Sequence, residues 1–293
     1  MAVRVMTAEQ HRIVLRRHQR WLILWPIIAY TLLALLSILT LIPIVWMFLT
    51  AFKSSNEAIA NPPTWFPQTW HPENFRAAWN FAPFGRYLVN TFFVAGSIMV
   101  LETTSSALAA YAFARLKFPG RDLLFLVYLG SLMVPRQVTL VPLFILIKEL
   151  HWIDTYQGLI IPQAFSAFGT FLLRQYFLTL PHELEDAARI DGASRFGCFW
   201  RIILPLSGPA LATLAVFIFL FQYNNLLWPL IISNTEQTRT VAIGLRDFQG
   251  QYGTDWSLLM AAATLATIPV IALYVFAQRW YIRGITLSGL GGR

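Results

Sequence analysis

Polar side chains set into apolar stretches are the residues of this 293-residue chain that are best placed to do chemistry. Gln222, Tyr223, Asn224 and Asn225 stand together in the charge-free run 202–235. Amides offer several hydrogen-bond partners and an aromatic ring offers a flat apolar face, which together suit a hydroxyl-rich ligand. The same side chains also suit hydrogen bonds between packed helices. Both interpretations stay open from the sequence: a ligand contact and a structural amide cluster.

Two charged residues also lie inside apolar runs. Glu102 is near the middle of one run, and Arg136 follows Pro135 in the next. A charge in an apolar layer is costly, so such a residue usually faces a cavity or a partner. The sequence therefore predicts that Glu102 and Arg136 face a shared pathway or pair with each other or with another subunit, the alternative being an ion pair that serves packing alone.

The most charged segment between two apolar runs is the stretch 181–201. Its first part reads as a short amphipathic helix with an acidic first turn, where the helix dipole favours negative charge. Gly192 then allows a sharp turn into a second helical piece. A helix resting on lipid headgroups is the alternative, but such helices usually carry Lys and Arg on their polar face. We therefore predict a docking hairpin, with these contact residues: Glu183, Leu184, Glu185, Asp186, Ala187, Ala188, Asp191, Gly192 and Phe196.

The composition is that of a membrane protein. The elements that position these residues are therefore expected to be membrane-spanning. Hydrophobic residues make up 57% of the chain and charged residues 12%, with a mean hydropathy of +0.56. Soluble domains carry about 25% charged residues. The net charge of +8 does not indicate nucleic-acid binding, because the arginines sit at the ends of apolar runs. Cys198 is the single cysteine, so no internal disulfide is possible.

Apolar runs of roughly 20 residues or more predict an all-α, polytopic fold with six transmembrane helices in one domain, 21–293, after a basic tail, 1–20. The first run is too long for the apolar core of a cleaved signal peptide. The predicted spans are, approximately, 21–50, 87–114, 123–147, 156–173, 202–233 and 256–277.

The distribution of basic residues predicts the orientation. Of the 22 Lys and Arg residues, fifteen lie in the two tails and in the connectors after the second and fourth spans, and six lie on the other side. Because basic residues favour the cytoplasmic side, we expect both termini and the hairpin to be cytoplasmic.

Known catalytic or metal-binding patterns do not appear in the sequence. It contains no GxxxxGK[ST] loop, no HExxH motif and no paired-cysteine site, and its five histidines are scattered over connectors. We therefore expect a protein that is not an enzyme and that holds no cofactor or metal of its own.

The hairpin resembles the EAA loop of permease subunits of binding-protein-dependent ABC importers. That pattern is Glu-Ala-Ala, three residues, Gly, nine residues, Ile, one residue, Leu-Pro. The matches here are Ala187, Ala188, Gly192, Ile202, Leu204 and Pro205. Asp186 stands where the family usually has glutamate, which keeps the charge on a shorter side chain.

The resemblance extends over nearly all of 20–290. The segments NPPTWFP, NTFFVAGS, MVPRQVTLVPLF and RGITLSGLGG are similar to those of the maltose-type, six-span permeases of the carbohydrate-uptake group. This resemblance implies a type I importer permease of the bacterial plasma (inner) membrane, whose hairpin serves as the ATPase-coupling helix. It also implies partners: a second, non-identical permease, two ATP-binding subunits that carry ATP and Mg²⁺, and an extracytoplasmic solute-binding protein.

The resemblance favours a sugar or sugar-like solute, passing along a pathway to which Glu102, Arg136 and the four residues 222–225 contribute. Permeases for glycerol-3-phosphate or a related phosphodiester resemble the sugar permeases strongly and are the alternative. A secondary transporter is less favoured, because the chain lacks two related halves and that class leaves the hairpin unexplained.

Overall fold

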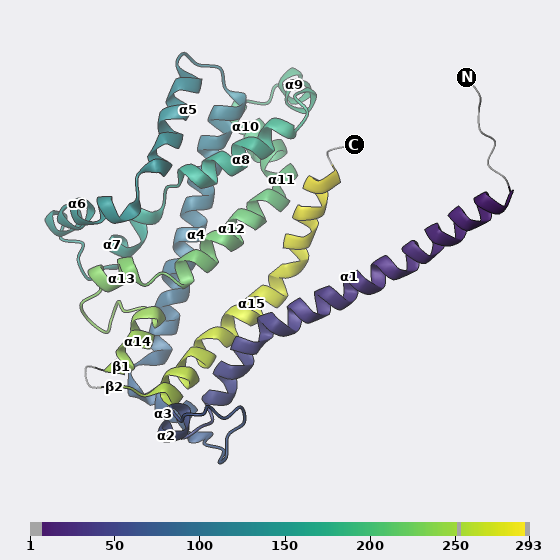
Figure 1. The fold of residues 1–293 in the computed structure, drawn as a ribbon. Coiled ribbons are helices and arrows are strands. Elements are labelled where there is room, and N and C mark those ends of the chain that lie inside the picture. The colour runs from purple at the N-terminus through teal and green to yellow at the C-terminus, as the bar shows by residue number, and fades with distance from the viewer. Residues whose placement is uncertain (1–7, 251–252, 291–293) are drawn as a thin grey trace.

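The computed structural model describes the backbone of residues 8–250 and 253–290, with the side chains of 25–250, 253–276 and 278. Residues 1–7 of the predicted tail, residues 251–252 and the last residues 291–293 lie outside the described part. The described chain is mostly helical, as the sequence predicts (Figure 1).

Short connections join helices of very different length. In chain order the elements are α1 (Ala8–Thr50), α2 (Ser55–Ala58), α3 (Glu73–Phe81), α4 (Phe84–Arg115), α5 (Arg121–Gly130), the 3₁₀ turn η1 (Ser131–Met133), α6 (Arg136–Glu149), α7 (Tyr156–Ile160), the 3₁₀ turn η2 (Ile161–Gln163), α8 (Ala167–Thr179), α9 (Glu183–Ile190), α10 (Arg195–Cys198), the π-helical turn η3 (Phe199–Ile203), α11 (Leu204–Leu206), α12 (Gly208–Tyr223), α13 (Leu227–Ile232), α14 (Val241–Asp247), the antiparallel strands β1 (Gln249–Gly250) and β2 (Gly253–Thr254), and α15 (Trp256–Leu290).

Helix α4 is the central helix of the bundle. It packs against α8 and α12, and α12 packs in turn against α15. One end of the bundle, the hairpin end, carries α9 and α10, and the opposite end, the loop end, carries α2, α3, β1 and β2 (Figure 1). Helices α4 and α15 both run between the two ends, so each of these two helices links the hairpin end to the loop end.

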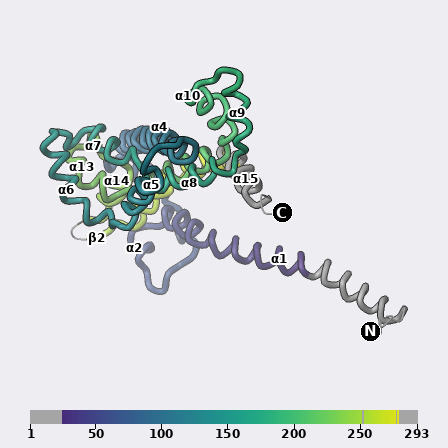
Figure 2. Tube along the Cα trace, turned by 90° about the horizontal axis from the view of Figure 1, so that it is seen from above, coloured from purple at the N-terminus to yellow at the C-terminus, as the bar shows by residue number. Residues whose placement is uncertain are grey.

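Helix α1 leaves the bundle. It packs against α15, and its apolar side chains from Trp25 onward are mostly exposed (Figures 1 and 2). A helix that is apolar all round has to be covered by lipid or by another protein. The helix also begins at Ala8, inside the predicted basic tail, because 8–20 is rich in helix-forming residues and contains no Gly or Pro.

The number of membrane crossings is not fixed at six by the described helices. Trp25–Thr50, Phe84–Arg115 and Trp256–Phe276 are long and apolar enough to cross alone, and the described chain has up to five spans if each of two bent helix pairs counts as one. The first of these pairs, Arg121–Met133 with Arg136–Glu149, is bent by 97°. The third predicted span is therefore not one straight helix, because Pro135 disfavours helical backbone at the residue before it.

The fourth and fifth predicted spans are also interrupted. Residues 156–173 form α7, η2 and only part of α8, with Pro162 in the intervening turn. In the fifth span, the helical segments Arg195–Leu206 and Gly208–Tyr223 meet at 77°, and α13 follows as a separate short helix. A proline cannot donate a backbone hydrogen bond, so interruptions of this kind fall near such residues.

Buried side chains form two clusters along α4. The cluster toward the hairpin end includes Ile98, Leu173 and Phe199, and the cluster toward the loop end includes Tyr87 and Phe219. Since α4 contributes to both, it is the element through which the two halves of the core are joined.

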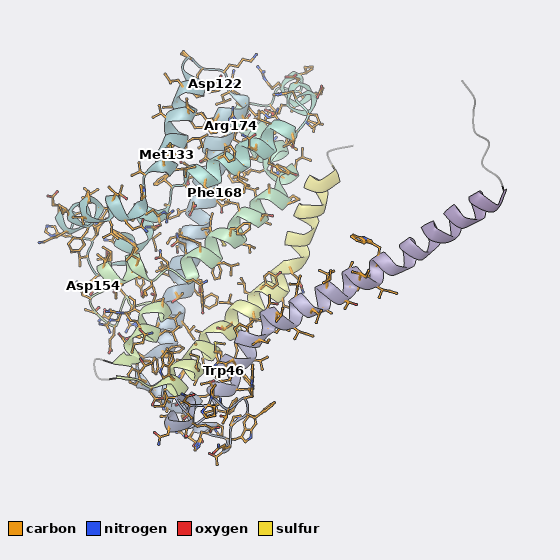
Figure 3. All side chains as sticks on the ribbon, in the orientation of Figure 1. Trp46, Asp122, Met133, Asp154, Phe168 and Arg174 are labelled. Carbon is orange, nitrogen blue, oxygen red and sulfur yellow. The ribbon has the colours of Figure 1, made fainter. Side chains whose placement is uncertain are left out.

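A carboxylate ties two loops together away from the hairpin end (Figure 3). Asp154 has a left-handed backbone (φ 59°), and its Oδ1 accepts hydrogen bonds from the backbone N–H groups of Asn234 (3.0 Å) and Thr235 (3.1 Å) and from the Thr238 hydroxyl. Its own N–H donates to the carbonyl of Ile232 at 2.9 Å. Burial alone would raise the pKa of Asp154, but these hydrogen bonds together bring it below its ordinary value.

Candidate functional site

The predicted hairpin consists of α9 and α10 joined by a tight turn. Gly192 adopts φ 85°, a left-handed conformation that favours glycine. The turn is closed by hydrogen bonds from Gly192 N to Arg189 O (3.1 Å) and from Ala193 N to Ala188 O (2.9 Å), the arrangement of a Schellman helix end. Ser194 then caps α10, because its hydroxyl accepts from Gly197 N at 3.1 Å.

The outer face of the hairpin is apolar and exposed. Ile190 is 87% exposed and Phe196 60%, and Leu184 and Trp200 are exposed as well. Exposed large apolar side chains gathered on one short motif mark an interaction surface. The other predicted contact residues on this surface are Glu183, Asp186, Ala187, Asp191 and Gly192, all exposed, with Ala188 half-buried.

One predicted contact residue faces the opposite way. Glu185 is buried, and its Oε1 lies 3.0 Å from Nε of Arg115 at the end of α4. Asp186, which occupies the glutamate position of the EAA pattern, is exposed instead. Sequence reasoning did not single out Arg115. Its place at the end of an apolar run, four residues after Tyr111, is the one local signal that was available.

Three of the predicted pathway residues line one cavity. It has a volume of about 400 Å³, and Glu102, Arg136 and Gln222 supply its charged and amide groups. Its remaining lining residues are Ser166, Phe168, Leu214, Phe217, Ile218 and Phe221. Figure 3 shows Phe168 between Arg174, toward the hairpin end, and Asp154, so the cavity lies between the two ends of the bundle. A few convergent polar groups in a mostly apolar cavity are the usual make-up of a small-molecule site.

The two charged residues of this cavity are held differently. Glu102 is buried on α4, where it lines the cavity together with Ser166 and Arg136. Arg136 is exposed at the start of α6, and its Nη1 donates to Oε1 of Gln163 at 3.3 Å. In the described part of the chain, no ion pair within 4.0 Å joins Glu102 to Arg136, so the two face the same space without direct pairing.

The residues of the predicted cluster 222–225 do not share one environment. Asn225 borders a second cavity of about 360 Å³, shared with Arg136 and Phe221, and donates to Oε1 of Gln222 at 3.1 Å. Asn224 is exposed, and its amide donates to the carbonyl of Leu220 at 2.8 Å.

Tyr223 lies on another side of α12. It is buried against α15, and its hydroxyl donates to the carbonyl of Ala266 at 2.7 Å. This is the interhelical hydrogen bond that the sequence left open as the alternative to ligand binding, and Tyr223 does not border the cavity of Glu102.

Metal chemistry has no candidate site among the described residues, where no group of three or more His, Cys, Asp or Glu side chains could hold an ion.

Comparison with known proteins identifies the class of protein that carries this hairpin and these cavities. Residues 103–287 match the family described as the binding-protein-dependent transport system inner membrane component. The chain belongs to this family, and it is a permease subunit of an ABC importer rather than an enzyme. It is a multi-pass component of the inner membrane. The secondary-transporter alternative is therefore excluded.

Relatives match almost the full chain. A probable ABC transporter permease of Bacillus subtilis, YurM, is 37% identical over 85% of this chain and 83% of its own. The arabinooligosaccharide permease AraQ of Halalkalibacterium halodurans is 35% identical over 91% of this chain and 98% of its own. The sn-glycerol-3-phosphate permease UgpE of Yersinia enterocolitica is 38% identical over 89% of this chain and 96% of its own.

Solved structures share the fold. A chain of a bacterial ABC transporter involved in the import of the acidic polysaccharide alginate superposes with a TM-score of 0.77 at 21% identity, over 88% of this chain and 96% of its own. A second alginate transporter structure, in complex with a periplasmic protein bound to an alginate pentasaccharide, gives a TM-score of 0.59 at 16% identity. The match covers 92% of this chain and 96% of that chain. The type I importer permease fold that the sequence predicts is thereby confirmed.

Proposed function

We propose that this subunit forms half of the translocation pathway for a sugar or sugar-like solute and is driven through its hairpin by a cytoplasmic ATPase. The observation that carries the docking part of this proposal is the exposed apolar face of Leu184, Ile190, Phe196 and Trp200. Such a face is unfavourable in water, and the hairpin stretch 181–201 carries four acidic against three basic residues, a balance that does not favour anionic lipid headgroups. A groove on a protein partner satisfies both features.

Docking is tested by placing a charge on this face. In the assembled transporter, we expect Phe196→Asp to abolish co-purification of the ATPase subunit, because a buried unpaired carboxylate is costly. The matched control is Phe196→Leu, which keeps an apolar side chain and is expected to retain the ATPase. Wild-type recovery of the ATPase with Phe196→Asp would contradict docking at this face.

The proposed assembly contains a second, non-identical permease, two ATP-binding subunits and an extracytoplasmic solute-binding protein. ATP and Mg²⁺ are bound by the ATP-binding subunits, because this chain contains no phosphate-binding GxxxxGK[ST] loop. The exposed apolar helix α1 has the surface that a second membrane subunit or lipid would cover. Mass determination of the detergent-purified complex tests the proposed stoichiometry.

For orientation, we propose that the hairpin end, with both termini, is cytoplasmic. Arg189, Arg195 and Arg201 lie within the hairpin stretch and Arg174 in α8 before it, and basic residues favour the cytoplasmic side. Labelling of Arg189→Cys in whole cells tests this orientation: an impermeant maleimide should react after the membrane is opened and not before.

A sugar is the solute class that the cavities support best. Gln222 and Asn225 provide amides, Phe221 a flat apolar face, and Glu102 a buried acceptor for hydroxyl groups. AraQ, among the relatives, carries arabinooligosaccharides. The test is a ligand screen by thermal shift on the partner solute-binding protein, whose unfolding temperature rises with the solute that it binds.

A glycerol-3-phosphate ester or a related phosphodiester is the alternative, and Arg136 is the observation that favours it. Its exposed guanidinium borders both cavities, and arginine suits phosphate recognition. UgpE is a glycerol-3-phosphate permease. The buried carboxylate of Glu102 beside the same space opposes an anion. The same thermal-shift screen separates the two classes when it includes both neutral oligosaccharides and glycerol-3-phosphate.

A further inference from the structure

The base of the hairpin is tied to the end of α4 by two side chains that stand one helical turn apart. Nε of Arg115 lies 3.0 Å from Oε1 of Glu185, close enough for the opposite charges to pair although these two atoms lack hydrogen-bond geometry, and the Arg115 side chain is 1% exposed. The hydroxyl of Tyr111 is 3.3 Å from Oε2 of the same carboxylate and donates to the backbone carbonyl of Arg195 at 3.0 Å. Side chains of α4 therefore hold both α9 and α10.

Arg115 also holds the chain that enters the hairpin. Its Nη2 donates to the carbonyls of Phe177 (2.5 Å) and Leu180 (2.7 Å), and its Nη1 lies 2.7 Å from Nδ1 of His182. Carbonyls at a helix end have no partner within the helix, so this guanidinium caps α8 while it pairs with α9. One buried side chain thus joins α4, α8 and α9.

The covalent route from the hairpin into the bundle is built differently. Between α10 and α12 the chain passes through the π-helical turn η3 and Pro205, and it bends by 77°. Ser207 at the bend is fully buried, and its hydroxyl has no hydrogen-bond partner in the described part of the chain. Such interruptions are where helices bend, whereas α4 is one unbroken helix.

We propose that Arg115 and Glu185 are positioning residues that make α4 move together with the hairpin. A displacement of the hairpin then reaches the cavity through Glu102, which lies on α4 about 20 Å from Arg115 at 1.5 Å per residue. The proposal rests on the proposed docking of the hairpin on an ATPase. It assigns transmission to α4, across a buried ion pair, instead of to the bent connection between α10 and α12.

The cleanest variant is Glu185→Gln, which keeps the side-chain shape and leaves Arg115 on the carbonyls of α8. Glu149→Gln is the matched control, because it makes the same change at an exposed position outside the hairpin and the two cavities. In proteoliposomes with the complete transporter, we expect Glu185→Gln to lower solute transported per ATP hydrolysed at least 10-fold, with normal co-purification of the ATPase. Glu149→Gln should stay within 2-fold of wild type.

A distance measurement separates transmission from simple stabilisation. Spin labels at Arg189→Cys on α9 and Leu108→Cys on α4, both exposed, report the distance between the two helices in a Cys198→Ala background. In the otherwise wild-type protein this distance should be the same with and without ATP, and Glu185→Gln should make it change or broaden on ATP binding. An unchanged distance distribution in Glu185→Gln, or wild-type transport per ATP, would overturn the proposal.

The remaining outcomes are also decisive. If Glu185→Gln loses the ATPase subunit altogether, the ion pair holds the docking conformation of the hairpin and does not transmit motion, which refutes the proposal. If Glu185→Gln does not fold, Tyr111→Phe, which removes one hydroxyl, replaces it in both measurements. Failure of docking itself is recognised separately, because Phe196→Asp would then retain the ATPase whatever Glu185→Gln does.

Discussion

The guanidinium carbon of Arg136 lies 5.2 Å from the centre of the Phe221 ring, so the start of α6 and the end of α12 meet at this contact. Both residues border the cavity of Glu102 and the second cavity beside Asn225. A cation over an aromatic face is attracted by about 0.5–2 kcal/mol, depending on its exposure to water. The contact therefore lies where the two cavities adjoin, and separating the two side chains would cost no more than this amount.

Replacement of Glu102 tests the cavity as part of the pathway. We expect Glu102→Ala to reduce transport at least 10-fold, because the cavity loses its buried acceptor. Transport by Glu102→Gln should fall between that of Glu102→Ala and that of wild type. The measurement is uptake of labelled solute into proteoliposomes, normalised to the amount of assembled transporter. Full transport by Glu102→Ala would exclude Glu102 from the pathway.

A charge swap distinguishes two ways in which Glu102 and Arg136 act together. Because no direct ion pair joins them, we expect the double variant Glu102→Arg, Arg136→Glu to remain as inactive as the worse single variant. Transport restored by the double variant would show instead that the two residues pair directly during the cycle.

Local patterns predicted the hairpin because its geometry is set by neighbours in sequence. The acidic first turn of α9 and the turn at Gly192 follow from short spacings. The pairing of Glu185 with Arg115 could not be predicted in this way, because the partners lie 70 positions apart and no local rule joins them. That pairing is the structural reason why Glu185 faces inward and Asp186 outward.

Proline explains why the spans were harder to predict. Pro26, Pro43 and Pro269 lie within continuous helices, whereas the chain bends by 97° next to Pro135. Prolines are tolerated in membrane helices when packing satisfies the freed backbone groups, so sequence alone does not tell a kink from a break. The amide cluster was divided for a simpler reason: each residue turns about 100° around the helix, so Gln222 and Tyr223 face different neighbours.

Gly192 offers a test of the turn. No atom would lie within 4 Å of a Cβ at this position, so a substitution here acts through the backbone conformation and not through crowding. An L-residue held in the left-handed backbone conformation costs roughly 1–2 kcal/mol, and β-branched residues tolerate this conformation least. We expect Gly192→Val to reduce ATPase co-purification and solute-stimulated ATP hydrolysis, and Gly192→Asn, which accepts this conformation, to retain most of both. Equal values for the valine variant and wild type would contradict the assignment of this turn to docking.

Asp154 predicts a dependence of stability on pH. Its folded-state pKa lies below the ordinary value, so its stabilisation is present above the pKa of the unfolded chain and is lost as the pH falls through the lower folded pKa. The difference in thermal midpoint between wild type and Asp154→Asn should therefore be largest near neutral pH and shrink below about pH 4, near the ordinary aspartate pKa. Asparagine keeps the left-handed preference, so the comparison isolates the charge. A difference that does not change with pH would assign the effect to shape alone.

The crossing of α4 and α8 depends on a close approach at Gly169. A Cβ at this position would lie 2.5 Å from Oγ of Ser106 and 3.4 Å from a methyl carbon of Leu214. We expect Gly169→Ala to lower the thermal midpoint of the detergent-purified protein, because overpacking of this kind costs about 1–3 kcal/mol. Gly96→Ala on α4 is the matched control: no atom lies within 4 Å of its Cβ, and alanine stabilises a helix interior by up to about 1 kcal/mol relative to glycine. Pairing Gly169→Ala with Ser106→Gly should recover part of the loss, since the second change removes the obstructing hydroxyl. If the two single alanine variants changed the midpoint equally and in the same direction, close packing of α4 against α8 would not be what Gly169 provides.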